Sequence, residues 1–249
     1  ACTGADGKLY LYGGYGLVAD SSAGYLNDLW VYDPVAQLWT WLQGSDQPNA
    51  AGVYGEKGVL DDANTPAGRA FSAGWTSESG DLYLFGGARY VSVNDTGAFG
   101  DLWRYHPETN QWAWLRGSAT SNSAGSYGEK GVEDQSNNPP SRSYATQWVG
   151  PDGLLYLFGG LHYDTDTKIF NHKNDLWRFN PATNNWTWIH GDQGYNVMGV
   201  YGEQGVADPE NSPGSRSYAA AWTDSEGNAL LYGGHGLNIW SHSELFNDF

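Results

Sequence analysis

A pair of adjacent glycines recurs four times along the chain at nearly constant intervals. The pairs stand at positions 13–14, 86–87, 159–160 and 233–234, so that successive spacings are 73, 73 and 74 residues. Each pair ends a short apolar run, such as Leu82-Tyr83-Leu84-Phe85. Because the residues around the pairs recur as well, the chain is an array of one supersecondary unit, and this constrains the fold more than any local pattern does.

Each unit contains four short stretches in which aromatic residues recur, bounded by Gly, Pro, Asn and Asp. In the third unit they run from Arg142 to Trp148, through the apolar run before Gly159, over Asp175–Phe179 and over Trp186–Trp188. Such runs are typical of strands, and no stretch has the sustained spacing of an amphipathic helix. Four short antiparallel strands per unit predict an all-β chain built of β-propeller blades.

The glycine pair, the Asp-Leu-Trp strand and the Trp that follows it together resemble kelch repeats. The resemblance covers every unit and implies a β-propeller, a fold that enzymes and binding proteins share. The units are longer than the ~50 residues usual for a kelch repeat. Copper oxidases with a kelch-like propeller need a Cys and Tyr cofactor pair, for which Cys2, the single cysteine, is a poor candidate.

Aligned on the glycine pairs, the chain is one propeller region that begins and ends inside a blade. We therefore expect a segment of a larger propeller, with a closed four-bladed ring as the alternative. The alignment gives a partial blade at 1–43, complete blades at 68–117 and 141–191, and a partial blade at 215–249.

The surplus length of every unit lies in one loop between the fourth strand and the next first strand. This loop is itself repeated, and it keeps Tyr, Gly, Glu, Gly, Val, Asn, Pro and Arg in three copies. We expect a defined structure in which each glutamate pairs with the arginine of its copy. The expected pairs are Glu56 with Arg69, Glu129 with Arg142, and Glu203 with Arg216.

Strand alternation places the long connections of all units on one face, which we call the long-loop face. It carries the repeated loops and the variable loops 15–26, 88–100, 161–174 and 235–246. Loops on a rigid scaffold commonly carry binding sites. We therefore expect ligand contacts on this face from large or polar residues of the variable loops, namely Tyr90, His162, Tyr163, His235 and Trp240.

Cation binding and glycosylation have weaker signals. His162, Asp164, Asp166 and His172 share one variable loop, but their spacing matches no zinc or EF-hand signature. We expect no cofactor, and calcium only as a weak ligand of Asp164 and Asp166 or of the repeated loop's acidic residues. Those residues are Asp61, Asp62, Glu133, Asp134, Asp208 and Glu210. Sequons at Asn94 and Asn185 are possible glycosylation sites.

Composition limits the partners. The formal net charge is −16, with 12 basic residues among 28 acidic ones, which argues against nucleic acid. No apolar run is long enough for membrane insertion. Few lysines and many Gly, Asn, Ser and Trp residues favour an extracellular or cell-surface protein, with a cytoplasmic one as the alternative.

From the sequence we expect a non-enzymatic binding or structural module that engages protein or glycan through the long-loop face. One alternative is the propeller part of a larger carbohydrate-active oxidase or isomerase. Another is a self-assembling building block of an extracellular filament or coat. Clustered, non-repeating His, Tyr and acidic side chains around the central channel would favour the enzyme.

Overall fold

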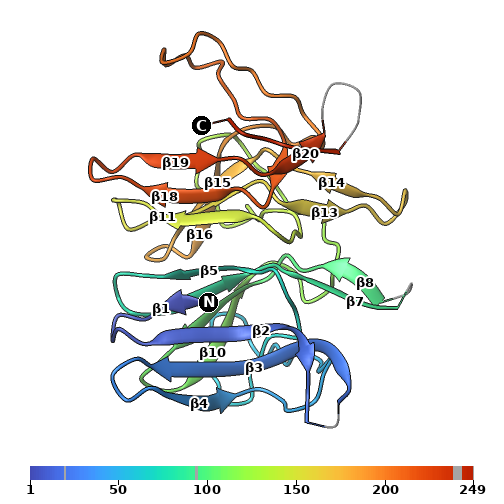
Figure 1. Cartoon of the computed structure of the whole chain (residues 1–249), viewed down its shortest axis with the longest axis vertical. Coiled ribbons are helices and arrows are strands. Elements are labelled where there is room, and N and C mark those ends of the chain that lie inside the picture. Colours follow the sequence, from blue (N-terminus) through green and yellow to red (C-terminus); the bar gives the residue numbers. More distant parts are fainter. Residues whose placement is uncertain (20, 93–94, 238–242, 249) are drawn as a thin grey trace. The chain divides into compact units, whose positions relative to one another are not determined.

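The computed structural model describes residues 1–19, 21–92, 95–237 and 243–248, and every regular element in that part of the chain is a strand (Figure 1). The chain divides into two compact units, Ala1–Ser123 and Ala124–Phe249, which we call unit 1 and unit 2. Within the described residues, no helix is long and apolar enough to cross a membrane. The predicted all-β, propeller-type fold is confirmed.

Unit 1 contains two antiparallel four-stranded sheets, each in the form of a propeller blade. The first has the order β1-β2-β3-β4, and the second has the order β10-β9-β6-β5. The first comprises β1 (Cys2–Thr3), β2 (Leu9–Leu17), β3 (Ala23–Asp33) and β4 (Leu38–Gln43). The second comprises β5 (Ala73–Thr76), β6 (Leu82–Phe85), β9 (Leu102–His106) and β10 (Gln111–Arg116), with the hairpin β7 (Ala88–Ser92) and β8 (Asp95–Ala98) between β6 and β9.

Unit 2 repeats this plan. Its four-stranded sheet has the order β11-β12-β15-β16 and comprises β11 (Thr146–Val149), β12 (Leu155–Phe158), β15 (Leu176–Asn180) and β16 (Asn185–His190). The hairpin β13 (Leu161–Tyr163) and β14 (Phe170–His172) lies between β12 and β15. The last repeat forms the pair β18 (Ala220–Thr223) and β19 (Ala229–Tyr232), and a separate sheet of β17 (Arg216–Ser217), β20 (His235–Leu237) and β21 (Ser243–Leu245).

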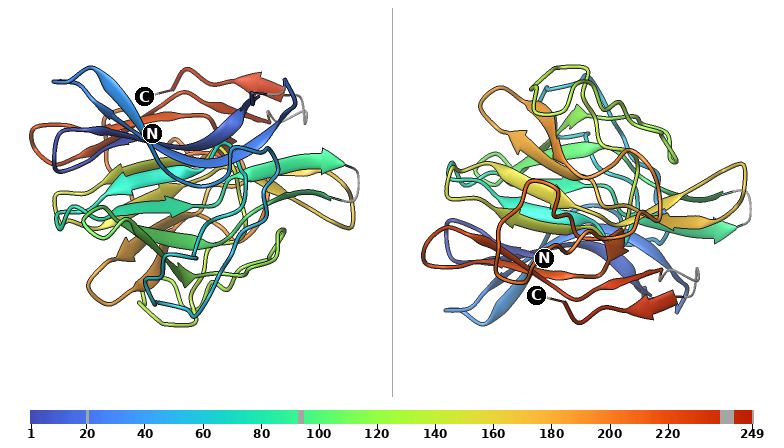
Figure 2. Two further views of the ribbon diagram at one scale, coloured as in Figure 1. Left: turned by 90° about the horizontal axis from the view of Figure 1, so that it is seen from below. Right: turned by 90° about the horizontal axis from the view of Figure 1, so that it is seen from above.

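Two of the expected variable loops are thus hairpins. β7–β8 and β13–β14 extend beyond the four-stranded sheets of their own units, as Figures 1 and 2 show. Both begin directly after a glycine pair. Gly159 and Gly160 have φ values of 64° and 100°, and a Cβ on Gly159 would lie 2.4 Å from the Arg216 carbonyl oxygen. Only glycine tolerates both conditions, which explains why the pair recurs.

The core of unit 1 lies between its two sheets. Leu29 and Val31 of β3 pack with Leu84, Trp103 and Tyr105 of the second sheet, and all five are buried. Alternation along β9 turns every second side chain towards this layer, as expected for a strand with one face on a core. The sheets therefore provide a rigid support for the loops that leave their ends.

Candidate functional site

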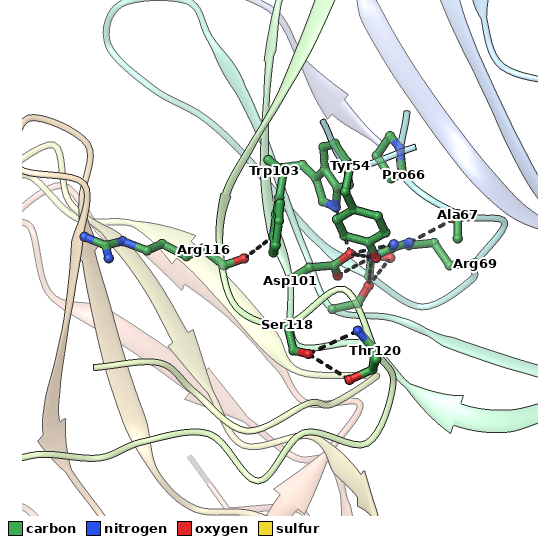
Figure 3. Close-up of polar contacts among 12 residues, drawn as sticks. Tyr54, Pro66, Ala67, Arg69, Asp101, Trp103, Arg116, Ser118 and Thr120 are labelled. Carbon is green, nitrogen blue, oxygen red and sulfur yellow. Dashed lines mark hydrogen bonds and ion pairs between the residues drawn. The ribbon is translucent and has the colours of Figure 1, made fainter. Parts of the chain in front are cut away.

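An ion pair between an arginine and an aspartate recurs in three repeats and is fully buried in two of them. In unit 1 the guanidinium of Arg69 binds Asp101 through two bonds, of 2.5 Å to Oδ1 and 2.8 Å to Oδ2 (Figure 3). Arg142 binds Asp175 at 2.6 and 2.7 Å, and Arg216 binds Asp248 at 2.6 and 2.7 Å. Paired, two-point contacts of this kind are strong and directional.

The predicted glutamate partners of the three arginines are therefore wrong. Glu56, Glu129 and Glu203 are exposed, and the repeated loop is fixed instead by its tyrosine. The Tyr54 hydroxyl donates a 2.7 Å bond to Asp101, beside the indole of Trp103, which donates one of 2.8 Å (Figure 3). Tyr and Trp bury a large apolar body and keep one donor, which suits them to a buried carboxylate.

Both members of the pair stay charged. Burial alone would lower the pKa of Arg142 and raise the pKa of Asp175, but their mutual attraction reverses both directions. Burial, followed by the charge of Asp175, raises the pKa of Tyr127, which holds that carboxylate as Tyr54 holds Asp101. Because the arrangement recurs, it is architectural, and functional residues are to be sought where the repeats differ.

Unit 2 departs from the repeat at Lys173. Phe99 and Phe246 stand at the equivalent position and cover Arg69 and Arg216, with ring centres 3.9 and 4.6 Å from the guanidinium carbons. Lys173 is fully buried, and its Nζ donates to the carbonyl oxygens of Gln193 and Gly194 at 2.7 and 3.0 Å. Burial lowers the pKa of Lys173 to about 8, against the opposing effect of Asp175.

His162 and Tyr195 form the next departure. The His162 ring is 5% exposed and stacks on Tyr195, with ring centres 5.3 Å apart and an angle of 9° between the planes. Its Nδ1 donates to the Ser141 carbonyl oxygen at 2.7 Å, so the lone pair of the neutral ring is at Nε2. Burial lowers the pKa of His162 and keeps the ring neutral. Tyr195 also covers Lys173, whose Nζ lies 4.2 Å from the ring centre.

A pair of histidines lies in the same unit. His172, at the end of β14, packs against His235 of β20 with ring centres 5.1 Å apart, and its Nδ1 shares a 3.2 Å hydrogen bond with the Ser217 hydroxyl. Burial, and then the nearby His235, lowers the pKa of His172 to about 4. Tyr218 meets His235 edge-on at 6.4 Å.

The backbone under Tyr218 is strained. Tyr218 and Tyr144 have φ values of 61° and 56°, in the left-handed region that bulky residues rarely adopt, and Phe71 of unit 1 has 64°. The ring centres of Tyr144 and Tyr218 lie 4.0 Å apart, with an angle of 34° between the planes. Tyr218 is 56% exposed. Because Phe71, Tyr144 and Tyr218 are equivalent positions, the left-handed backbone belongs to the repeat, and it fixes the place of an exposed ring in unit 2.

We use the term histidine cluster for two groups of unit 2, His162 with Tyr195, and His172 with His235 and Tyr218. Because His162 pairs with Asn171, and Leu161 pairs with His172, the two groups lie on opposite faces of the hairpin β13–β14. The sequence identified His162 and His235, and it placed His172 with the acidic residues of its loop. It missed Tyr195, Tyr218 and Lys173, although the replacement of an aromatic residue by Lys173 is visible once the repeats are aligned. His162 is buried rather than exposed.

Other predicted site residues lie apart from this cluster. Tyr163 packs on Phe170 at 4.8 Å, and Tyr90 of unit 1 packs on Tyr25 at 6.0 Å. Asp164 accepts the backbone N–H groups of Asp166 and Thr167, which forms a turn. In the described ranges, no three His, Cys, Asp or Glu side chains are arranged to hold one metal ion. Asn185 begins β16, whereas Trp240 and Asn94 lie outside the described residues.

The cluster combines imidazoles with phenol hydroxyls, and burial lowers the pKa of His162 and of His172 so that both rings stay neutral. A neutral imidazole with a free lone pair can accept a proton, and a phenol can donate one. Aromatic faces provide a surface for the apolar side of a sugar ring. Each of the two groups thus combines an imidazole with a phenol ring.

Comparison with known proteins gives a family and a set of named relatives. The Kelch motif family matches residues 1–46. N-acetylneuraminate epimerases of Escherichia coli K12 and Shigella flexneri are 27% identical over 166 residues, which is 61% of this chain and 45% of each relative. N-acetylneuraminate epimerase 2 of Escherichia coli O6:H1 is 26% identical over the same length. The match therefore spans less than half of the relatives' length.

Among solved structures, one titled "Structure of YjhT" aligns with 98% of this chain and 77% of its own, at 14% identity and a TM-score of 0.44. A likeness this weak carries no argument about function.

Proposed function

The chain carries kelch repeats folded as β-propeller blades, and we propose that it contributes to an epimerase that acts on an acidic sugar of the N-acetylneuraminate type. The single observation that carries the proposal is the non-repeating histidine cluster, found in a chain whose curated relatives are named N-acetylneuraminate epimerase. Arrays of identical repeats explain the ion pairs, but they do not explain His162, His172 and His235.

This proposal replaces the expectation of a non-enzymatic binding or structural module. The names of the relatives contradict that expectation and agree with its carbohydrate-isomerase alternative. The cluster agrees with the enzyme alternative in part. Its histidines do not recur in the other repeats, whereas Tyr218 aligns with Tyr144 and Phe71, and no acidic side chain belongs to the cluster.

Epimerisation inverts one stereocentre and requires a group that accepts a proton and a group that returns it. His162 suits the first role, because its Nδ1–H is held by the Ser141 carbonyl and its lowered pKa keeps Nε2 unprotonated near neutral pH. His235 is half-buried beside the exposed Tyr218, and either can meet a substrate. Tyr195, 40% exposed, closes the other side of His162.

The strained tyrosines suit the task of holding the sugar. Tyr144 and Tyr218 are positioned by left-handed backbone and by the bond from the Tyr218 N–H to the Tyr144 carbonyl oxygen, of 3.1 Å. Stacking on such a surface orients a pyranose ring with little loss of side-chain entropy. His235 meets Tyr218 edge-on at 6.4 Å and so lies beside this surface.

The test is proton NMR of N-acetylneuraminate with the protein present. We expect interconversion of its epimeric forms faster than in buffer, and a loss of about 10²-fold or more in His162→Asn, the magnitude typical of a general base. His106→Asn is the matched control, because His106 binds Asp81 in unit 1 and lies outside the cluster. No acceleration by the wild type, or equal rates in the two variants, would refute the proposal.

A further inference from the structure

Lys173 is a buried cation that the proposed reaction does not use. Its side chain is fully buried, and lysine is almost never fully buried without a charged partner. Among the described residues, no carboxylate lies within ion-pair distance of its Nζ, which donates to the carbonyl oxygens of Gln193 and Gly194. The third N–H is left to two aromatic rings, with centres 4.2 Å away for Tyr195 and 5.3 Å away for Tyr127. Lys173 therefore keeps one donor to which the described chain supplies no anion.

The neighbouring charges leave this cation without a counter-ion. Burial lowers the pKa of Lys173 to about 8, so the side chain is still charged at neutral pH. Asp175 is close in sequence, but both of its carboxylate oxygens bind the Arg142 guanidinium. Asp192 forms no ion pair with Lys173 in the described part of the chain. Asp164 accepts two backbone N–H groups within its own turn. An anion brought to Lys173 would thus meet an unpaired positive charge.

The Tyr195 ring lies over both Lys173 and His162, and we call this ring the cover. It stacks on His162 with an angle of 9° between the planes, and His162 is only 5% exposed. A base this deeply buried cannot reach a substrate while the ring stays in place. Tyr195 itself is 40% exposed, so there is solvent beside the ring into which it can turn. The cover therefore has to turn aside before His162 can act as the proposed base.

The backbone of the cover is held at its two ends. The Asp192 N–H donates to the Asn174 side chain at 3.1 Å, and the Asn196 N–H donates to the His172 carbonyl oxygen at 2.8 Å. Between these points, no backbone N–H of residues 193–195 donates a hydrogen bond within the described ranges. Segments with few backbone hydrogen bonds open more readily than the strands that flank them. The cover can therefore turn without breaking β14 or β16.

An asparagine fixes the same register in both units. The Asn122 side chain accepts the Ala98 N–H at 2.9 Å, and the Asn196 side chain accepts the His172 N–H at 2.9 Å. Asn49 has the same role in the first repeat, at 3.0 Å. All three asparagines have left-handed φ values, of 60°, 53° and 61° in that order. The residues just before Asn122 and Asn196 are therefore structurally equivalent.

Unit 1 shows the space that the cover occupies. Ser121 stands there where unit 2 has Tyr195, and Phe99 stands where it has Lys173. In unit 1 a cavity of about 230 Å³ is lined by both of these residues and by the repeated loop. Because the register is the same, turning the Tyr195 ring outward opens a similar space over Lys173 and beside His162. Pockets for drug-sized ligands measure about 300–1,000 Å³, so this space takes one smaller molecule.

We propose that Tyr195 covers an anion site, in which Lys173 binds the carboxylate of a small acidic ligand once the ring has turned aside. The ligand replaces the aromatic contact of the ammonium by a charge-assisted hydrogen bond from the third N–H, and such bonds are the stronger class. The carboxylate follows from the unpaired cation, whereas its identity as that of an acidic sugar rests on the proposed function. The site then places the sugar next to Nε2 of His162.

The test is calorimetry of the whole chain at neutral pH with D-glucuronate and with D-glucose, which differ by a carboxylate. Neither probe is the substrate of the proposed reaction, so binding is measured independently of turnover. Because a ligand that binds only the open form gains affinity when the cover is removed, Tyr195→Ser should bind D-glucuronate about tenfold or more tightly than the wild type does. Tyr195→Phe is the matched control, since it keeps the stacked ring and should bind as the wild type does.

The role of the cation is tested in the Tyr195→Ser background. There D-glucuronate should bind about tenfold or more tightly than D-glucose, as expected for a hydrogen bond to a charged group. Adding Lys173→Met should make the two affinities equal, whereas Lys168→Met, at an exposed position after β13, should keep the preference. Equal affinities of Tyr195→Ser for the two sugars, including no binding of either, would overturn the proposal. So would D-glucuronate binding that is no tighter in Tyr195→Ser than in the wild type.

A second readout needs neither ligand nor activity. Carbethoxylation of His162 by diethyl pyrocarbonate, followed by mass spectrometry of the digested protein, reports access to the unprotonated Nε2. Its rate should rise about tenfold or more in Tyr195→Ser and stay unchanged in Tyr195→Phe. An equal rate in Tyr195→Ser and the wild type would show that the ring is not a cover. The two Tyr195 variants decide the proposal even if Lys173→Met does not fold. A failed epimerase assay with the expected D-glucuronate binding would overturn only the proposed function.

Discussion

The ammonium group of Lys173 lies 4.2 Å from the centre of the Tyr195 ring. In the preceding repeat the residue equivalent to Lys173 is Phe99, whose ring covers Arg69. A buried cation next to the Arg142 guanidinium costs free energy unless it is compensated. The compensation comes from Tyr195 and from the carbonyl oxygens of Gln193 and Gly194, all in the segment that follows β16. Lys173 thus fixes this segment, including the tyrosine that stacks on His162.

Replacing Lys173 should change how stability depends on pH. The pKa of this lysine is about 8 in the folded chain and 10.5 for an unperturbed lysine, so the unfolded state binds more protons between these limits. Its contribution to the free energy of unfolding therefore rises with pH from about 8 to about 10.5. Urea unfolding at pH 8 and pH 10 should show this rise in the wild type but not in Lys173→Met. Lys168→Met, at an exposed position, should keep it.

His172 should make the protein sensitive to mild acid. The pKa of His172 is about 4 in the folded chain and 6.5 for an unperturbed histidine, so the unfolded state binds more protons in that window. Stability is therefore lost as the pH falls from about 6.5 to 4, by roughly 1–3 kcal/mol for this one group. His172→Gln should remove this share of the loss in denaturant titrations at pH 7 and 4.5. A loss that is as large in His172→Gln as in His190→Gln would contradict the assignment.

The three ion pairs should contribute unequally to the free energy of unfolding. The Asp175 side chain is fully buried, whereas that of Asp248 is 25% exposed. Removing one partner of a buried pair leaves an uncompensated charge and costs about 3–5 kcal/mol, and exposure to water reduces this cost. Thermal unfolding should therefore show a larger loss for Asp175→Asn than for Asp248→Asn. A larger loss for Asp248→Asn would show that burial of the ion pair does not determine its contribution to stability.

The repeated loop should depend on its tyrosine and not on its glutamate. Tyr54→Phe removes a 2.7 Å bond to a buried carboxylate and should cost about 1–2 kcal/mol of stability. Glu56→Gln alters an exposed side chain and should stay within about 0.5 kcal/mol. Chemical denaturation of the two variants measures both effects. A larger loss in Glu56→Gln would restore the pairing first expected from the sequence.

The fold could be predicted because its signals recur. Gly159 and Gly160 are required by backbone geometry, and Trp103 and Trp177 by packing, so each repeat carries the same marks. The arginine partners could not be predicted in the same way. Glu56 lies closer to Arg69 in the sequence than Asp101 does, yet strand pairing brings Asp101 beside Arg69 and leaves Glu56 in solvent.

The histidine cluster was visible only in part. His162 and His235 stand in loops where a functional residue is expected, but Tyr195 and Tyr218 stand in segments that recur and so are readily taken as architecture. Their role follows from contacts across the unit, such as the stacking of Tyr195 on His162. A single substituted position, Lys173 in place of an aromatic residue, was the signal available in the sequence.

The side-chain contacts of Asn49, Asn122 and Asn196 each fix one end of a four-residue segment that can change in sequence. The four residues before each asparagine are held at one end by the asparagine side chain and at the other by the blade, so their side chains can vary while the backbone path is kept. In one copy this segment leaves a cavity beside Arg89. In another it contains Tyr195, which stacks on His162. A repeat of this design can acquire a new ligand by a few substitutions, without any change of fold.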